Sequence, residues 1–122
     1  QIRNDKYLNK IYSASDLFII SSRIDNLPLT GMESQACGTS VVTFNYSGLP
    51  ELIENKSTGS LADPFSFESL AREIKWAIED DRTQDMSIKS RKRAEKIWGE
   101  NIIYNSYEKI FEKILFNQTL QK

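Results

Sequence analysis

Two acidic residues, Asp25 and Glu33, stand eight positions apart in the segment of this sequence best suited to chemistry. Between them lie a short loop that contains Pro28 and the expected start of a helix. A carboxylate accepts hydrogen bonds from hydroxyl groups, and the backbone amides at the start of a helix favour an anion. The segment therefore predicts a binding site for a ligand that carries both hydroxyls and negative charge.

The flanking residues predict the frame that positions this segment. Leu17–Ser21 is an almost entirely apolar run, typical of a strand covered on both faces. Ser40–Phe44 is rich in β-branched residues, which favours a second strand. Strand, loop, helix and strand form one βαβ unit, in which the loop follows the carboxyl end of the first strand. Ligands of open parallel sheets bind at that end of the strands.

The pattern Thr30-Gly-Met-Glu33 also has a purely structural interpretation. It matches a capping box, with Thr30 as the N-cap and Glu33 at the third helical position. The helix is expected to run to Cys37, and Gly38 would end it in a left-handed conformation. Glu33 could therefore serve the cap, a ligand, or both. Asp25 could likewise be a loop aspartate that bonds its own backbone in an Asx turn.

The remaining patterns complete an α/β fold. Helices are expected over residues 5–14, 51–54, 67–79, about 83–98 and about 101–116, and a third strand over 58–62. This order predicts a three-layer, Rossmann-like parallel sheet, and three strands resemble the second half of a six-stranded domain. Such a sheet leaves an edge open to pairing with another chain. The last helix is expected to dock on something apolar through Ile103, Tyr107, Ile110, Phe111, Ile114 and Leu115.

Composition excludes several function classes. A formal net charge of −1 gives no electrostatic reason to expect a nucleic-acid partner. There is no histidine, so the chemistry must use carboxylates, amides and backbone dipoles, and no metal site is expected. The single cysteine, Cys37, is expected in the core and fits a reducing compartment. The longest apolar run near the start is far too short to cross a bilayer. A basic run (Lys89, Arg91, Lys92, Arg93 and Lys96) indicates either a solvated helix face or contact with a membrane surface.

An ordered set of motifs resembles one family. These are Tyr12–Asp16, Ser21–Ser22, Asp25 and Glu33 with seven residues between them, Ser34–Val42, Ser47–Glu51, and Thr58–Gly59. Together they resemble the C-terminal, donor-binding part of retaining glycosyltransferases with the GT-B fold, the group 4 family (glycosyl transferases group 1), over about residues 8 to 115. The sequence departs from the family pattern at three positions. Asp25 stands where the family has glutamate, and Ser21 and Ser40 stand where it has proline.

The resemblance implies a role for each candidate residue. Glu33 would accept hydrogen bonds from the ribose hydroxyls of the donor nucleotide, and Asp25 would orient the transferred sugar through its hydroxyls. Backbone amides of the loop and helix start would face the diphosphate. Pro28 has no amide, so the candidates there are Asn26, Leu27, Leu29 and Thr30. Ser47 and Gly48 are weaker candidates, since a simple strand-to-helix turn also explains them.

The resemblance also implies what the whole enzyme does. It implies a hexosyltransferase-type enzyme of polysaccharide biosynthesis that uses a nucleotide-diphosphate sugar, with UDP expected, and transfers the sugar to a glycan or lipid-linked acceptor without a metal or other cofactor. Residues 1–122 would form a single partial domain that lacks the N-terminal acceptor domain and is inactive alone. A cytoplasmic location is implied, peripheral at the inner face of the cytoplasmic membrane through the missing part. The alternative is a non-catalytic α/β module that self-associates as a homodimer through its exposed sheet edge.

Overall fold

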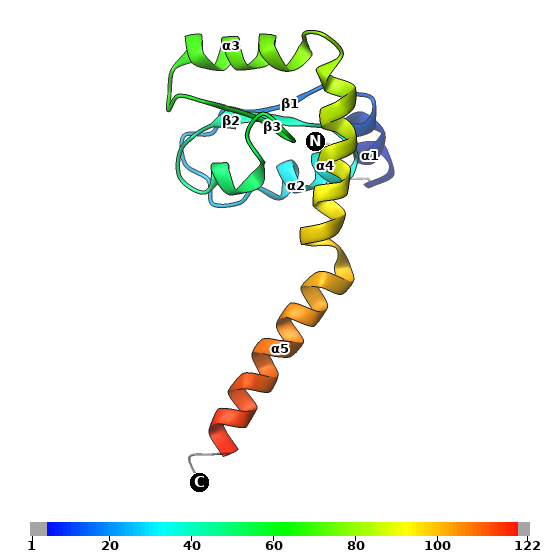
Figure 1. Ribbon diagram of the computed structural model, residues 1–122, viewed down its shortest axis with the longest axis vertical. Coiled ribbons are helices and arrows are strands. Elements are labelled where there is room, and N and C mark those ends of the chain that lie inside the picture. Colours follow the sequence, from blue (N-terminus) through cyan, green and yellow to red (C-terminus); the bar gives the residue numbers. More distant parts are fainter. Residues whose placement is uncertain (1–4, 120–122) are drawn as a thin grey trace.

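Three parallel strands form the sheet at the centre of the computed structural model, which describes residues 5–119 (Figure 1). The strands lie in the order β1-β2-β3, with Phe18 opposite Val41 and Val41 opposite Gly59. The elements are α1 (Asp5–Ser13), β1 (Phe18–Ile20), α2 (Leu29–Ala36), β2 (Val41–Phe44), the 3-10 helix η1 (Leu49–Leu52), β3 (Gly59–Ala62), α3 (Phe67–Ile78), α4 (Arg82–Trp98) and α5 (Glu100–Thr119). The expected α/β order and parallel sheet are confirmed.

Helices cover the sheet on both faces and make it the middle of three layers. In Figure 1, α3 lies on one side of the strands, while α2 and η1 lie on the other. The core between these layers contains Val41, Val42, Leu49 and Leu52, all with 0% exposure. Met86 of α4 closes the core, since α4 packs against both α2 and α3. Burial of these apolar side chains is the main favourable term that holds the layers together.

The first strand is less covered than its apolar sequence predicts. Ile19 is 45% exposed, so the expectation that both faces of this strand are buried is wrong. The reason is the position of the strand, because β1 is an edge strand of the sheet and α3 packs over β2 and β3 instead. Ile20 points the other way and is buried beneath α2. A hydrophobic edge of this kind is open to pairing with a further strand.

The last helix lies apart from the layers. Figure 1 shows α5 extending away from the sheet and its flanking helices. Its expected docking residues are all exposed: Ile103, Tyr107, Ile110, Phe111, Ile114 and Leu115. The predicted helix is confirmed, but the predicted apolar contact is not formed within the described part of the chain. Although α5 is 20 residues long, no helix within residues 5–119 is apolar enough to cross a membrane.

Candidate functional site

The loop between β1 and α2 stays outside the helix. Residues 21–28 form a bend, and α2 begins at Leu29 with Pro28 as its N-cap at φ −67° and ψ 124°. The Pro28 carbonyl accepts the first backbone hydrogen bonds, from Gly31 (3.0 Å) and Met32 (3.3 Å). The helix therefore starts earlier than the capping box requires, and the prediction of Thr30 as the N-cap is wrong. The cap of α2 has no side-chain hydrogen bond, so Glu33 does not serve it.

A second turn holds this loop in place at the carboxyl edge of the sheet. The amide of Gly48, in the turn after β2, donates to the carbonyl of Asp25 at 3.0 Å. The two backbones are so close that a Cβ at Gly48 would lie 1.6 Å from the carbonyl oxygen of Asn26. Ser47, just before, has a positive φ of 55°, which turns the chain toward the loop. The structure thus brings four predicted residues together: Asp25, Asn26, Ser47 and Gly48.

Glu33 has a different set of neighbours. The hydroxyl of Tyr12, a largely buried residue of α1, donates to Oε2 of Glu33 at 3.4 Å. Burial of Tyr12, together with the charge of Glu33, raises the pKa of the Tyr12 hydroxyl, which keeps it a donor. Glu33 itself is exposed, and it lines a cavity of about 270 Å³ between α1 and α2. The Glu33 carboxylate is therefore oriented by Tyr12 on one side and accessible from the cavity on the other.

The four candidate residues of the loop and helix start are exposed. Asn26 and Thr30 are exposed, and Leu29 is 69% exposed, whereas Asp25 is half-buried. The amides of Leu29 and Thr30 precede the first intrahelical donor, Gly31, so they have no acceptor within the helix. The fourth residue of this set, Leu27, is 36% exposed.

The underside of α2 is tightly anchored, which fixes the loop above it. A Cβ at Gly31 would lie 2.3 Å from Cδ2 of Leu52, so the absence of a side chain lets α2 approach the core closely. Gln35 donates from Nε2 to the Leu52 carbonyl at 2.8 Å. Thr43 donates from Oγ1 to the Ile20 carbonyl at 2.9 Å, at the point where the chain enters the loop.

The sequence analysis assigned no role in the site to the residues that hold it in place, Tyr12, Gly31, Gln35 and Thr43. For Tyr12, the only signal in the sequence was its place in the first motif of the family resemblance. The approach of Gly31 to Leu52 depends on contacts distant in sequence, so local patterns carry no sign of it. Cys37, expected in the core, is a free thiol that is only half-buried. Within the described residues, no group of three or more acidic or cysteine side chains could hold a metal ion.

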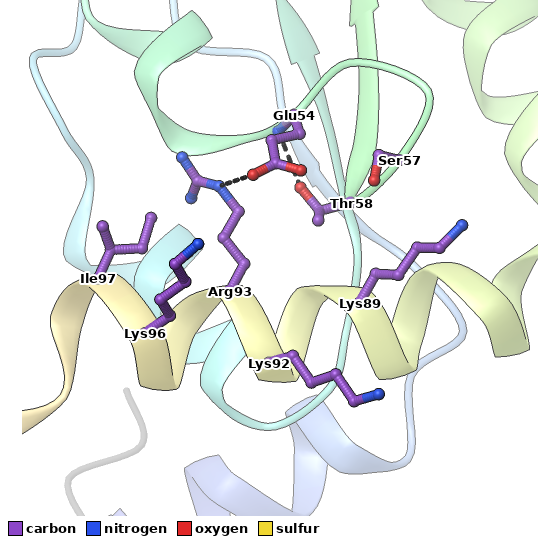
Figure 2. A pocket seen from close by; sticks show the side chains of 8 residues that line it. All are labelled: Glu54, Ser57, Thr58, Lys89, Lys92, Arg93, Lys96 and Ile97. Atoms are coloured by element: carbon purple, nitrogen blue, oxygen red, sulfur yellow. Dashed lines mark hydrogen bonds and ion pairs between the residues drawn. The ribbon is translucent and has the colours of Figure 1, made fainter.

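A second concave surface lies beside α4. Lysine and arginine side chains of α4 line it together with Glu54, Ser57 and Thr58 (Figure 2). Thr58 immediately precedes the first residue of β3, whereas the Asp25 loop follows the last residue of β1. Because the strands are parallel, Thr58 and the Asp25 loop lie at opposite ends of the strands.

Comparisons with known proteins give one family. The family model described as glycosyl transferases group 1 matches residues 2–96. One similar protein is the N,N'-diacetylbacillosaminyl-diphospho-undecaprenol alpha-1,3-N-acetylgalactosaminyltransferase of Campylobacter jejuni. It is 26% identical over 102 residues, which are 84% of this chain and 27% of that protein.

Solved structures give the same fold. Sucrose-phosphate synthase of Thermosynechococcus elongatus superposes with a TM-score of 0.86 at 24% identity, over 96% of this chain and 29% of that one. Anabaena HepE in complex with UDP-glucose superposes with a TM-score of 0.71 at 24% identity, over 88% of this chain and 31% of that one. At this identity the likeness shows the fold alone. The chain spans less than a third of each of these proteins.

Proposed function

The chain belongs to the glycosyl transferases group 1 family, and we propose that it forms the donor half-site of a retaining glycosyltransferase. The donor is a nucleotide-diphosphate sugar, with UDP as the nucleotide. The observation that carries this proposal is the contact between Gly48 and the Asp25–Asn26 backbone, because it holds the loop at the carboxyl edge of the sheet. The complex of HepE with UDP-glucose supports the choice of nucleotide, since HepE has the same fold.

Each polar group of the site has a separate part in donor binding. Glu33, oriented by Tyr12, accepts hydrogen bonds from the two ribose hydroxyls. The amides of Leu29 and Thr30 face the diphosphate, where the dipole of α2 favours negative charge. This charge grows as the bond between the anomeric carbon and the diphosphate breaks, so the same amides stabilise the leaving group.

The role of Asp25 in this proposal is to bind the sugar of the donor. It lies at the carboxyl end of β1, and hydrogen bonds from sugar hydroxyls to its carboxylate orient the anomeric carbon. The side chain is one methylene shorter than the glutamate of the family pattern. The hydrogen bond between its carbonyl and Gly48 fixes the backbone from which this shorter side chain must reach.

The roles of Glu33 and Asp25 can be distinguished with UDP and UDP-glucose, which differ by one sugar. In Glu33→Gln, the affinity for both UDP and UDP-glucose is expected to fall at least about tenfold, since a hydrogen bond to a charged group contributes roughly 1.5–3 kcal/mol. In Asp25→Asn, only the affinity for UDP-glucose is expected to fall. Calorimetric titration measures both. Glu108→Gln, on exposed α5, is the matched control. Equal affinities in all three variants would contradict the assignment.

The proposal extends to the acceptor and to the location of the whole enzyme in the cell. The acceptor is a glycan or a lipid-linked sugar, and the transferred group is a hexose, in keeping with polysaccharide biosynthesis. The named substrate of the Campylobacter jejuni relative, a diphospho-undecaprenol, supports a lipid-linked acceptor. A lipid-linked acceptor in turn favours the inner face of the cytoplasmic membrane. The free thiol of Cys37 accords with a reducing cytoplasm.

One observation favours a second candidate function. β1 is an edge strand with the half-exposed Ile19, which could pair with the same strand of a second copy. In this alternative the chain is a non-catalytic module that forms a homodimer. Ile19→Lys is expected to return such a dimer to a monomer in light scattering, without loss of folding. A monomeric wild-type chain would exclude the alternative.

A further inference from the structure

Two half-exposed aromatic side chains, Tyr46 and Phe65, lie at the carboxyl edge of the sheet, and together they form an aromatic platform. Tyr46 follows β2 and Phe65 follows β3, and their rings meet edge to face with centroids 5.0 Å apart. The guanidinium of Arg23, from the loop after β1, lies 5.7 Å from the centroid of the Phe65 ring. Each of the three strands is therefore followed by one member of this cluster.

Phe65 occupies a backbone position that does not suit a bulky residue. The amide of Ser66 donates to the carbonyl of Asp63 at 3.2 Å, which closes a turn with Pro64 and Phe65 at its centre. Phe65 has a positive φ of 61°, and the corresponding position of a type II turn is usually glycine or asparagine. The turn itself thus gives no reason for a phenylalanine. An unfavourable conformation of this kind points to a role of the side chain.

Packing fixes the Phe65 ring without covering it. The buried ring of Phe44 supports it from the core, with centroids 6.0 Å apart, and half of the Phe65 side chain stays exposed beside Tyr46. Arg23 is exposed and forms no ion pair with a carboxylate of the described residues. The cluster therefore offers two ring surfaces and a set of N–H donors to a ligand from solvent.

The aromatic platform adjoins the proposed donor site. Tyr46 belongs to the turn in which the Gly48 amide donates to the Asp25 carbonyl. Because the strands lie in the order β1-β2-β3, the loops that follow them have the same order along the carboxyl edge. The Asp25 loop comes first, then Tyr46, and then Phe65. A donor sugar bound at Asp25 would therefore have the platform beside it.

We propose that the aromatic platform binds a pyranose ring of the acceptor, next to the donor sugar. One face of a pyranose carries C–H groups, which are attracted to the negative face of an aromatic ring. The N–H groups of Arg23 can donate to its hydroxyl oxygens. This assignment rests on the proposed function, since the ring belongs to an acceptor only if a donor is bound at Asp25. In this arrangement the chain contacts both substrates of the transfer.

Amide chemical shifts of the isotopically labelled chain test the proposal, with methyl β-D-glucopyranoside as the probe and UDP at saturation. We expect the glucoside to shift the amides of residues 46 and 65. Tyr46→Ala and Phe65→Gly are each expected to weaken its binding at least about fivefold, since loss of one aromatic contact costs roughly that factor. Glycine adopts a positive φ without strain, so the turn keeps its shape. The matched control is Phe67→Ala, which removes an exposed phenylalanine of α3 and is expected to bind the glucoside as the wild type does.

The possible outcomes separate this proposal from the proposed function. If the chain binds UDP but the glucoside shifts neither residue 46 nor residue 65, or if all three variants bind the glucoside equally, the platform is overturned and the donor site stands. If Phe65→Gly weakens the binding of UDP-glucose but not of UDP, the platform belongs to the donor sugar and the acceptor assignment is overturned. Absence of UDP binding would instead contradict the proposed function, and the acceptor role with it.

Discussion

Replacement of Gly48 by alanine tests the geometry on which the donor site depends. The new Cβ would lie 1.6 Å from the Asn26 carbonyl oxygen and 2.4 Å from its carbon, and both are backbone atoms. Since non-bonded atoms rest roughly 3.5 Å apart, the two loops must separate by about 2 Å. This separation breaks the 3.0 Å hydrogen bond from Gly48 to Asp25.

The expected size of the effect follows from those contacts. The lost hydrogen bond costs about 1 kcal/mol and the overpacking about 1–3 kcal/mol, so the midpoint of thermal unfolding is expected to fall by roughly 8–16 °C. A shift of about 2 Å takes the loop out of hydrogen-bond reach of the donor, and each lost hydrogen bond to a charged group costs roughly 1.5–3 kcal/mol, so we expect UDP-glucose affinity to fall at least about tenfold. Thermal unfolding and calorimetric titration measure the two effects.

The control for this prediction is Gly38→Ala. Gly38 has a φ of +82° at the carboxyl end of α2, so alanine there costs roughly 1–2 kcal/mol of stability. Its position is away from the loop, and UDP-glucose affinity is expected to stay unchanged. If Gly48→Ala bound the sugar nucleotide as well as Gly38→Ala does, the account of the loop contact would be refuted.

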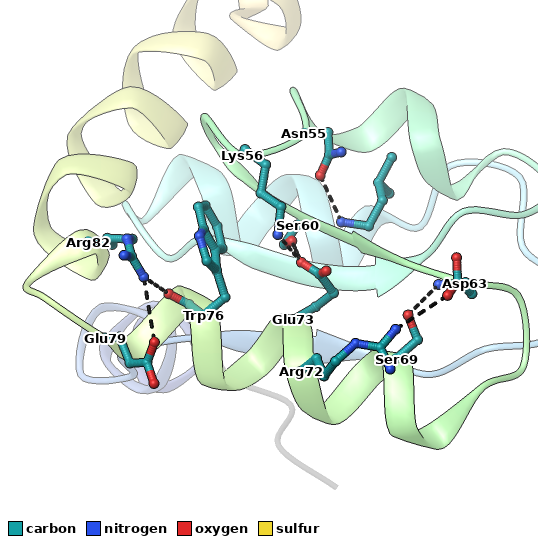
Figure 3. A network of polar contacts seen from close by, with 11 residues as sticks. Asn55, Lys56, Ser60, Asp63, Ser69, Arg72, Glu73, Trp76, Glu79 and Arg82 are labelled. Atoms are coloured by element: carbon teal, nitrogen blue, oxygen red, sulfur yellow. Dashed lines mark hydrogen bonds and ion pairs between the residues drawn. The ribbon is translucent and has the colours of Figure 1, made fainter.

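Two further predictions concern stability. Burial alone would raise the pKa of Glu73, but hydrogen bonds from Lys56 and Ser60 outweigh it and hold the pKa below its usual value (Figure 3). The stability that this lowered pKa contributes is present above the unfolded-state pKa and is lost as the pH falls through the folded-state pKa. Glu73→Gln should therefore make the free energy of unfolding fall less steeply with decreasing pH. An equally steep fall in the variant would contradict this. Gly31→Ala should cost about 1–3 kcal/mol because its Cβ meets Leu52, and Leu52→Ala about 2–5 kcal/mol. In the double variant, the shortened side chain at position 52 makes room for the new Cβ at position 31. Chemical denaturation should therefore show a loss of stability smaller than the sum of the two single losses.

The sequence predicts the elements of this fold well because their signals are local. The β-branched run at Ser40–Phe44 and the stop signal at Gly38 each depend on a few neighbouring residues, and both predictions are confirmed within a residue or two. The exposed Ile19 was not predictable in the same way. An apolar run predicts a strand, but which strand lies at the edge depends on how the whole sheet assembles.

In the candidate site, too, the local features were predictable and the contacts between distant segments were not. Its segment follows from the spacing of Asp25 and Glu33, but the start of α2 was misjudged, because Pro28 fixes its own φ and initiates the helix in place of Thr30. The contact of Gly48 with Asn26 joins turns that follow two different strands. Only the pairing of β1 with β2 brings these turns together, so no local pattern could predict it.

Amide chemical shifts recorded while UDP-glucose is titrated into the isotopically labelled chain test the central claim most directly. A donor site at the carboxyl edge of the sheet predicts that the largest changes fall in residues 25–33 and 47–48. Changes confined to α4, or no saturable change at any amide, would contradict it.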